Sequence, residues 1–213
     1  MKQKCLKIAT LTFAITMGAN LLFAQDTQKG AIDFYGASIA GKVWFVSGEN
    51  DFTDDYSGTL YGLTANYSFT ENFSIMALGL FGSVDTDSGL NKDEIDAEFC
   101  LAYNFDFFAL GGGARYSKES FGQTKNDAYG PMIFAGVGTY IFDTDLSWYA
   151  TGSWMFTDLG DSENMEHYVL EGGLAYTWEH IVIKGGYRYK DYYESEINYK
   201  EHGFTASLGY MFY

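Results

Sequence analysis

Three histidines are the side chains best suited to act as a general base near neutral pH. His180 falls in a short segment between two predicted strands, whereas His167 and His202 lie near strand ends. Glu166 and Ser162 are close to His167 in the sequence, so a hydrolase that acts on lipid or peptide is one hypothesis. No serine stands in the glycine-flanked turn of nucleophilic hydrolases. We therefore expect that the protein is not an enzyme.

Acidic residues gather between the predicted strands. Asp85, Asp87 and Gly89 superficially resemble the start of a calcium loop, but the glycine comes one place early and no glutamate closes the loop. We predict no resident metal and no cofactor, and interpret these segments as solvated loops; binding of an external ligand or of cations there is the alternative. The acids are Glu49, Asp51, Asp54, Asp55, Asp85, Asp87, Asp93, Glu94, Asp158, Asp161, Glu163, Glu166, Asp191, Glu194, Glu196 and Glu201.

The composition excludes several classes of protein. The 213 residues carry a formal net charge of −15, which argues against a nucleic-acid partner because the phosphate backbone would be repelled. Aromatic residues make up 19% of the chain, which contains 25 glycines and one proline. Disordered chains are poor in aromatics, and coiled coils are rich in Ala, Glu, Lys and Leu. The length suits one domain.

Alternation of apolar and polar residues dominates the chain. Between 61 and 69, for example, Tyr61, Leu63 and Ala65 alternate with glycine, threonine and asparagine, which is the period of a β-strand. Short turns alternate with longer acidic connections, so we predict a closed antiparallel up-and-down barrel of ten strands, with eight strands as the alternative. The predicted strands are 31–46, 59–69, 73–84, 94–105, 107–117, 128–142, 146–158, 166–178, 181–191 and 202–213.

The first residues have the layout of an export signal. Lys2, Lys4 and Lys7 precede a mostly apolar stretch that ends at Ala24 and is too short and too interrupted for a spanning helix. We predict a cleaved signal peptide over 1–24, a polar segment over 25–30 and the barrel over 31–213. The exported chain would keep one cysteine, Cys100, and so no internal disulfide.

The polar face of the strands indicates which side of the barrel is enclosed. It is mostly Gly, Ser, Thr, Ala and Asn, which suits a crowded interior, whereas the outer face of a soluble barrel would be rich in Lys and Glu. Aromatic residues gather near both strand ends, as two membrane interfaces select. A soluble barrel with aromatic cores is the alternative. We assign Trp44, Trp154 and Tyr189 to the girdle near the long loops, and Trp148, Trp178, Tyr210 and Phe212 to the girdle near the turns.

A few charges fall on the polar face, and hairpin register predicts partners for them. Two-residue turns after Phe105 and Trp178 place Glu98 opposite Arg115 and Glu171 opposite Arg188. Pairing is expected because an unpaired charge in a low-dielectric lumen is costly. Two interpretations remain open, a structural plug and the charged constriction of a narrow cation-preferring pore. Lys42, Asp96, Lys184 and Lys190 extend the predicted network.

These features together resemble the small outer-membrane β-barrels of Gram-negative-type bacteria, such as opacity-type and porin-like proteins. The resemblance rests on the leader, the alternating strands, the girdles and the closing Phe-Thr-Ala-Ser-Leu-Gly-Tyr-Met-Phe-Tyr, in which Tyr213 follows the outward Phe212 that would usually end the chain. It implies location in the outer membrane and contact with its lipid. It also implies delivery by the barrel-assembly machinery through the last strand, and a monomer. Adhesion, solute passage and envelope maintenance are all compatible with it.

Overall fold

The computed structural model describes residues 36–50, 55–87, 89, 91–105, 107–121, 124–142, 144–156, 166–194 and 197–212. The predicted signal peptide over 1–24 and the polar segment over 25–30 lie outside these residues. No helix in the described part of the chain is long and apolar enough to cross a bilayer.

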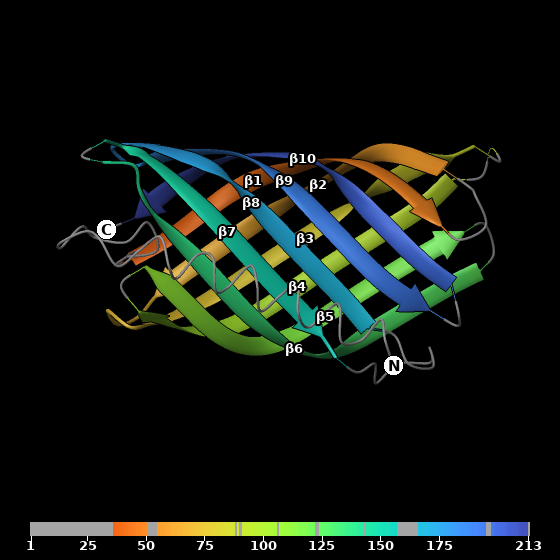
Figure 1. Cartoon of the computed structure of the whole chain (residues 1–213), viewed down its shortest axis with the longest axis horizontal. Helices are drawn as coiled ribbons and strands as arrows, with labels where there is room; N and C mark the ends of the chain where they lie inside the picture. Colours follow the sequence, from red (N-terminus) through yellow and green to blue (C-terminus); the bar gives the residue numbers. More distant parts are fainter. Residues whose placement is uncertain are drawn as a thin grey trace.

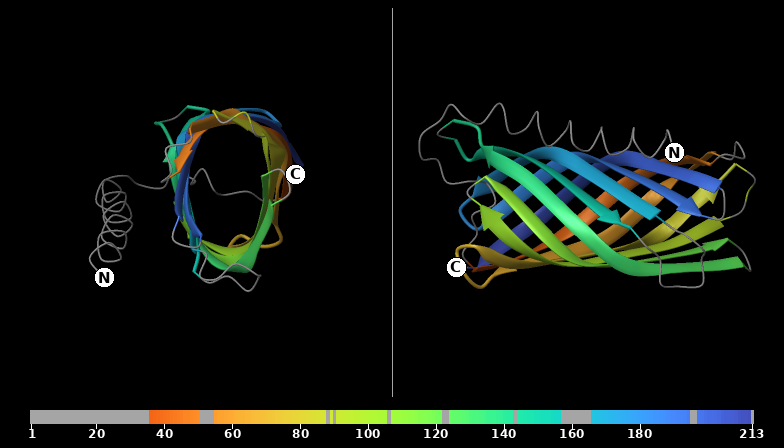
Figure 2. Two further views of the ribbon diagram at one scale, coloured as in Figure 1. Left: turned by 90° about the vertical axis from the view of Figure 1, so that its right-hand side faces the viewer. Right: turned by 60° about the horizontal axis from the view of Figure 1, so that its bottom comes forward.

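Ten antiparallel strands form one closed barrel, in which each strand pairs with its neighbour in sequence and β1 closes on β10. The tilted strands and their closed ring are visible in Figures 1 and 2. The predicted ten-stranded barrel is therefore confirmed, and the eight-stranded alternative is wrong. The strands are β1 (Gly36–Asn50), β2 (Asp55–Ser68), β3 (Phe73–Thr86), β4 (Asn91–Phe105), β5 (Phe108–Phe121), β6 (Thr124–Tyr140), β7 (Leu146–Met155), β8 (Glu166–Trp178), β9 (Ile181–Glu194) and β10 (Ile197–Phe212).

Most strands extend further toward the long-loop end than predicted. The predicted loop over 118–127 is largely strand, because β5 ends at Phe121 and β6 begins at Thr124; β9 and β10 are similarly joined across Glu194 and Ile197. Hydrophobic alternation detects a strand only where one face is apolar. Here the backbone ladder continues into segments that are polar on both faces, so the pattern misses it.

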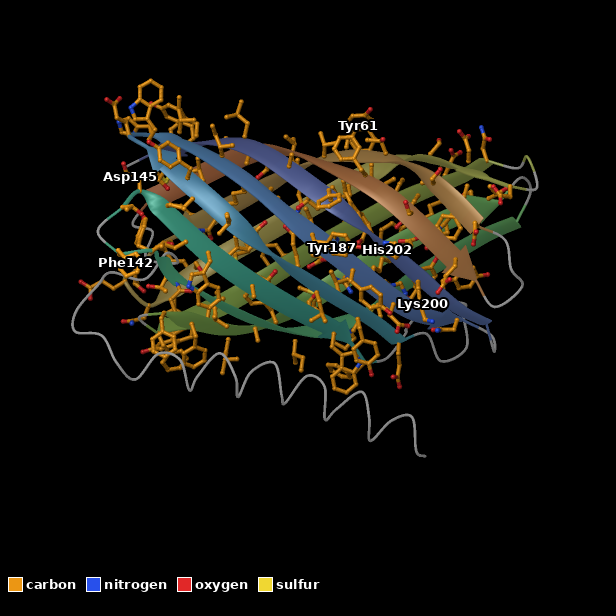
Figure 3. All side chains as sticks on the ribbon, turned by 45° about the horizontal axis from the view of Figure 1, so that its top comes forward. Tyr61, Phe142, Asp145, Tyr187, Lys200 and His202 are labelled. Carbon is orange, nitrogen blue, oxygen red and sulfur yellow. The ribbon has the colours of Figure 1, made fainter. Side chains whose placement is uncertain are left out.

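The outer wall is apolar, whereas charged, polar and clustered apolar side chains share the inner wall. Leu63, Phe81 and Leu208 expose 58%, 60% and 62% of their surface on the outside. Figure 3 shows side chains such as those of Tyr61 and Tyr187 on the outer wall. An exposed apolar surface of this extent is typical of a barrel whose solvent is lipid rather than water.

Trp44 is a correction to the predicted girdle, because its side chain points into the lumen and is 0% exposed. Trp44 lies two residues after Lys42 on β1, and Lys42 faces inward. Because side chains alternate between the two faces of a strand, both point into the lumen. The adjacent Phe45 is the outward residue, at 54% exposure. Trp44 packs in a lumen cluster with Leu60 and other apolar side chains.

A glycine marks the seam at which β1 and β10 close the barrel. The register pairs Trp44 with Thr205 and then Ser47 with His202, and Gly203 lies in the interval between these pairs. Its φ of +156° is one that side chains rarely adopt, and a Cβ atom there would overlap the carbonyl oxygen of Phe45. Closure at this point therefore needs a residue without a side chain.

We expect Gly203→Ala to destabilise the barrel by about 1–3 kcal/mol because the added Cβ strains the seam. Gly41→Ala is the matched control on β1 of the same seam, where a Cβ would have no atom within 4 Å. The measurement is the urea midpoint at which the unboiled protein loses its folded migration on a detergent gel. Equal midpoints for the two variants would contradict the role of Gly203.

Candidate functional site in the barrel lumen

Alternate residues on two strands carry charged side chains that point into the lumen. On β4, Lys92, Glu94, Asp96 and Glu98 are alternate residues, and the first three are 0–1% exposed. On β9, Arg188 and Lys190 have the same inward orientation and are 3% and 0% exposed. In the closed ring, β4 and β9 are separated by four strands on either side, so they face each other across the lumen. Charges on one can therefore reach charges on the other.

The first layer of the network is centred on Arg188 of β9. Its Nη2 atom lies 3.2 Å from Asp96 Oδ2 and 3.0 Å from Glu98 Oε1, both on β4. Its Nη1 atom lies 3.3 Å from Oε2 of Glu171, its register partner on β8. The face of the Trp44 indole covers the guanidinium group, 5.3 Å from the ring centre. One arginine thus joins opposite walls of the barrel.

The other predicted pair of this layer also lies together. Glu98 is the register partner of Arg115, and Glu98 Oε1 lies 2.5 Å from Arg115 Nη2. Arg115 also donates to Ser153 Oγ at 2.7 Å. Lys42 extends the layer as predicted from its parity, with Nζ 2.5 Å from Glu171 Oε2. The layer therefore contains both predicted pairs, joined through Arg188.

A second layer lies nearer the long-loop end. Lys92 Nζ is 3.2 Å from both Glu94 Oε2 and Glu119 Oε1, and it also binds Glu201 of β10. Lys190 Nζ is 2.5 Å from Glu94 Oε1 and 3.5 Å from Glu201 Oε2. Every one of these side chains is at most 2% exposed. Two ammonium groups and three carboxylates fill this level of the lumen.

Two of these glutamates correct the interpretation of the acidic segments as solvated loops. Glu94 and Glu201 belong to β4 and β10 and point inward, because the strands continue through the segments predicted as loops. Glu49, Asp55, Asp85, Asp93 and Asp127 are also on strands, but they point outward and are exposed. Asp51, Asp54, Asp158, Asp161, Glu163 and Glu196 lie outside the described residues.

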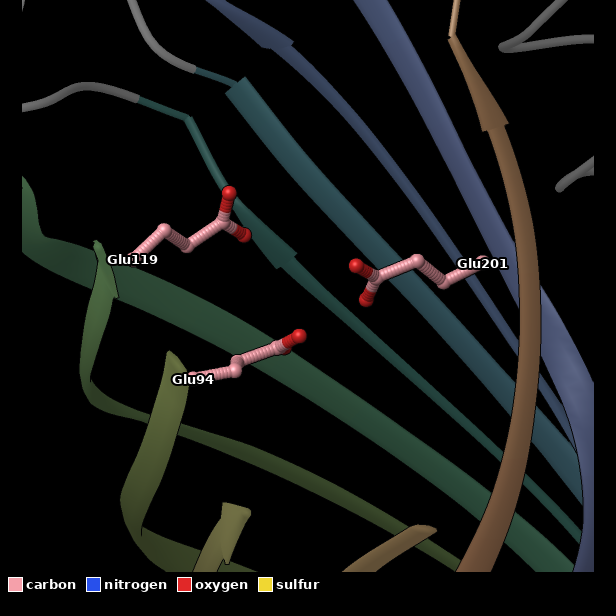
Figure 4. Close-up of side chains that lie close together, drawn as sticks. All are labelled: Glu94, Glu119 and Glu201. Atoms are coloured by element: carbon pink, nitrogen blue, oxygen red, sulfur yellow. The ribbon is translucent and has the colours of Figure 1, made fainter. Parts of the chain in front are cut away.

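The three carboxylates of the second layer converge closely enough to suggest a metal site. Oxygen atoms of Glu94, Glu119 and Glu201 lie within 4.8 Å of one another, and Figure 4 shows the side chains approaching from opposite walls. However, Lys92 Nζ lies within salt-bridge distance of all three. The protein thus provides its own cation at the position that a hard metal ion would occupy.

Tyrosines complete the second layer. The Tyr192 hydroxyl donates to Glu119 Oε2 at 2.7 Å and accepts from Lys92 Nζ at 2.9 Å. The Tyr56 hydroxyl donates to Glu201 Oε1 at 3.1 Å. Tyr192 satisfies the Glu119 oxygen that the two ammonium groups do not reach, and Tyr56 shares Glu201 Oε1 with Lys92. Charges buried this deeply need such partners.

Lys184 faces a different part of the lumen. It lies nearer the turn end than Arg188, with Nζ 5.5 Å from the ring centre of Tyr149, and it is exposed although it points inward. Among the described residues, no carboxylate lies within salt-bridge distance of it. The half-buried Asn66 and Thr64 also face this region from β2. The lumen is therefore less tightly filled around Lys184 than in the second layer.

The two candidate catalytic histidines lie on opposite faces of the wall. His167 points into the lumen, is 0% exposed and stacks on Tyr192 with ring centres 5.2 Å apart. His202 lies on the outer wall, where its Nδ1 atom is 2.7 Å from the Tyr187 hydroxyl. Figure 3 labels His202 and Tyr187. The structure therefore does not bring the two histidines into one site.

The remaining girdle residues point away from the lumen. Trp154 and Tyr189 lie toward the long-loop end of β7 and β9, and the Trp154 ring stacks on Tyr168. Trp178, Tyr210 and Phe212 are exposed at the turn end, where Tyr210 and Phe212 contact edge to face. Trp148 lies at the same end on β7, with outward parity. Aromatic side chains thus occur on the outer wall near both ends.

Sequence reasoning missed Lys92, Glu119, Tyr56 and Tyr192 as lumen residues. The alternation in the sequence already contained this information. Lys92 lies an even number of residues from Asp96 on β4, and Glu119 lies an even number from Arg115 on β5, so each points to the same face as that neighbour. Extending the alternation beyond the apolar part of each strand would have found them. Their partners on other strands could not be found in this way.

The family of the chain follows from comparison with known proteins. The family model described as "Outer membrane protein beta-barrel domain" matches residues 11–212, so the chain belongs to this family of outer-membrane β-barrels. Comparison with curated proteins gives no match.

Comparison with solved structures gives matches at low sequence identity. The translocator domain of the autotransporter NalP from Neisseria meningitidis has a TM-score of 0.50 and 11% identity, covering 99% of this chain and 98% of that chain. The outer membrane protein OprG from Pseudomonas aeruginosa has a TM-score of 0.42 and 11% identity, covering 88% and 100%. The similarity to the NalP translocator domain concerns the barrel fold alone.

We expect Lys190→Met to destabilise the barrel by about 3–5 kcal/mol because it leaves Glu94 and Glu201 buried without their second cation. Lys200→Met is the matched control. Its ammonium group pairs with Glu49 at 3.6 Å on the exposed rim, where an ion pair contributes about 0–1 kcal/mol. Urea unfolding in lipid vesicles measures both. A loss below 1 kcal/mol for Lys190→Met would show that the cross-lumen pairs do not brace the barrel.

Proposed function

We propose that the protein is an integral outer-membrane barrel with a closed lumen and a structural and surface-interaction role, rather than a pore or an enzyme. The observation that carries the proposal is the second charge layer. Lys92, Glu94, Lys190 and Glu201 come from three strands, and each is at most 1% exposed. Side chains packed in this way leave no path for a hydrated solute at that level.

The balance of charge in the lumen also argues against a cation-preferring pore. Among the side chains that the structure describes, six acids and six bases face the lumen, so these groups together carry no net charge that would attract cations. The lumen acids are Glu94, Asp96, Glu98, Glu119, Glu171 and Glu201, and the lumen bases are Lys42, Lys92, Arg115, Lys184, Arg188 and Lys190.

Planar-bilayer conductance tests the closed lumen. We expect the wild-type protein to be silent and the charge-balanced variant Glu94→Ala with Lys190→Ala to give current steps, because it removes a bridge between β4 and β9. Glu49→Ala with Lys200→Ala is the control, since it removes an ion pair from the outer rim. Heat-modifiable gel migration verifies that each variant is folded.

Two results would contradict a lumen closed by the second layer. Steady cation-selective steps from the wild type, lost in Arg115→Ala with Arg188→Ala, would favour the narrow pore. A folded inner variant that stays silent would show that the second layer is not the barrier.

The surface-interaction part of the proposal rests on the outward acids of the strand extensions. Glu49, Asp55, Asp85, Asp93 and Asp127 are exposed at the long-loop end, where Lys118 and Lys200 are the outward bases among the side chains that the structure describes. A rim with this excess of negative charge attracts cationic partners over about one Debye length, roughly 8–10 Å in physiological salt.

Adhesion of vesicles to an immobilised cationic peptide measures this attraction. We expect vesicles with the protein to adhere in a salt-dependent way, and the variant Asp55→Asn, Asp85→Asn, Asp93→Asn to adhere several-fold less. The inward variant Glu119→Gln is the control. Equal adhesion of all three would overturn the role of the rim.

A further inference from the structure

The outer wall contains a hollow of about 510 Å³ over β4, β5 and β6. Six of its lining residues directly flank the inward Glu98 and Arg115 or the buried Gly130, so alternation points their side chains outward. These six are Ala97, Phe99, Ala114, Tyr116, Tyr129 and Pro131. The hollow and the charge layers thus lie on opposite faces of the same three strands.

Differences in side-chain size produce the hollow. Ala97 is the register partner of Tyr116, and Ala114 is the partner of Phe99, so each short side chain has a large ring beside it. Tyr116 also pairs with Tyr129 on β6, and these two rings stand at the end of the hollow nearer the long loops. The two alanines therefore form its floor, and the rings form its walls.

The size and position of the hollow favour a single hydrocarbon chain as its occupant. Phe99 and Tyr129 are 54% and 48% exposed on the wall that faces lipid, so an apolar group meets this surface first. A helix with its side chains is roughly 10–12 Å across, and about 510 Å³ would hold only about one turn of it. An acyl chain is only one methylene group wide and can lie along the floor.

Two opposite charges stand just beyond the tyrosine end of the hollow. Lys118 follows Tyr116 by two residues on β5, about 7 Å further along the wall. Its Nζ atom lies 4.0 Å from Oδ1 of Asp127, its register partner on β6, and the two side chains are 33% and 48% exposed. An exposed pair at this distance is weak, so both groups are accessible to a ligand.

This pair complements a headgroup that carries a phosphate beside an ammonium group. The phosphate would meet Lys118 and the ammonium group would meet Asp127. A purely anionic headgroup fits less well, because Asp93 is a further exposed acid on the neighbouring strand β4. It would therefore meet two carboxylates and one ammonium group.

We propose that the hollow binds one acyl chain of a zwitterionic phospholipid, with its phosphate at Lys118 and its ammonium group at Asp127. The inference rests on the proposed role as an integral barrel, because a bilayer is what presents acyl chains to this wall. It assigns to β4, β5 and β6 a discrete lipid site, in addition to the general contact that the apolar wall makes with the membrane.

Native mass spectrometry of the full chain refolded in detergent tests the acyl-chain site. We expect one phosphatidylethanolamine to be retained per chain. Ala114→Phe should retain several-fold less, because it places a ring on the floor of the hollow. Ala206→Phe is the matched control, since Ala206 is an exposed alanine on β10, which faces β5 across the barrel. Heat-modifiable migration verifies that each variant is folded.

The headgroup preference is tested with phosphatidylglycerol of the same acyl chains, which is anionic. We expect the wild type to retain it several-fold less than phosphatidylethanolamine, and Lys118→Gln with Asp127→Asn to lose this preference. Glu49→Gln with Lys200→Gln is the control, because it removes the other outward ion pair of the rim.

Three results would overturn the proposal: no phospholipid retained by the wild type, equal retention by Ala114→Phe and Ala206→Phe, or equal retention of the two lipids by the wild type. The lipid count is independent of planar-bilayer conductance. Current steps from the wild type would contradict the closed lumen without changing the lipid count, so the two failures are distinguishable.

Discussion

Ion pairs between β4 and β9 connect opposite walls of this barrel, and the arrangement of the lumen depends on them. Arg188 bridges to Asp96 and Glu98, and Lys190 bridges to Glu94. Each charge would be very unfavourable alone in the enclosed interior, so each is retained only because its partner lies on another strand at the same level. The network therefore connects opposite walls of the barrel at two levels of the lumen.

The outer wall follows a separate constraint. Every backbone group inside a membrane needs a partner within the protein, and the closed ladder from β1 to β10 provides it. The side chains outside that ladder then face lipid, which explains why residues such as Leu63 and Leu208 are exposed on a stable protein. At the long-loop end the same ladder continues past the apolar band, and acids such as Asp85 occupy the outward positions.

Much of the fold was accessible from local pattern. Period two predicted ten strands, and the short turns predicted their antiparallel order. Register across two hairpins also placed Glu98 opposite Arg115 and Glu171 opposite Arg188, since neighbours in a hairpin are fixed by the turn. Trp44 was assigned wrongly to the girdle because its residue type was given more weight than its position in the strand alternation. Strand ends were misplaced because polar residues on both faces carry no alternating signal.

The sequence by itself determined the class of fold, the side of the wall on which most residues lie, and the partners of charges within a hairpin. Only the tertiary structure decided that Lys190 meets Glu94 and that Lys92 lies among three carboxylates. The physical reason is that alternation and turns act over a few residues. Contacts across a lumen depend on how the closed sheet curves and staggers its strands, which no local pattern encodes.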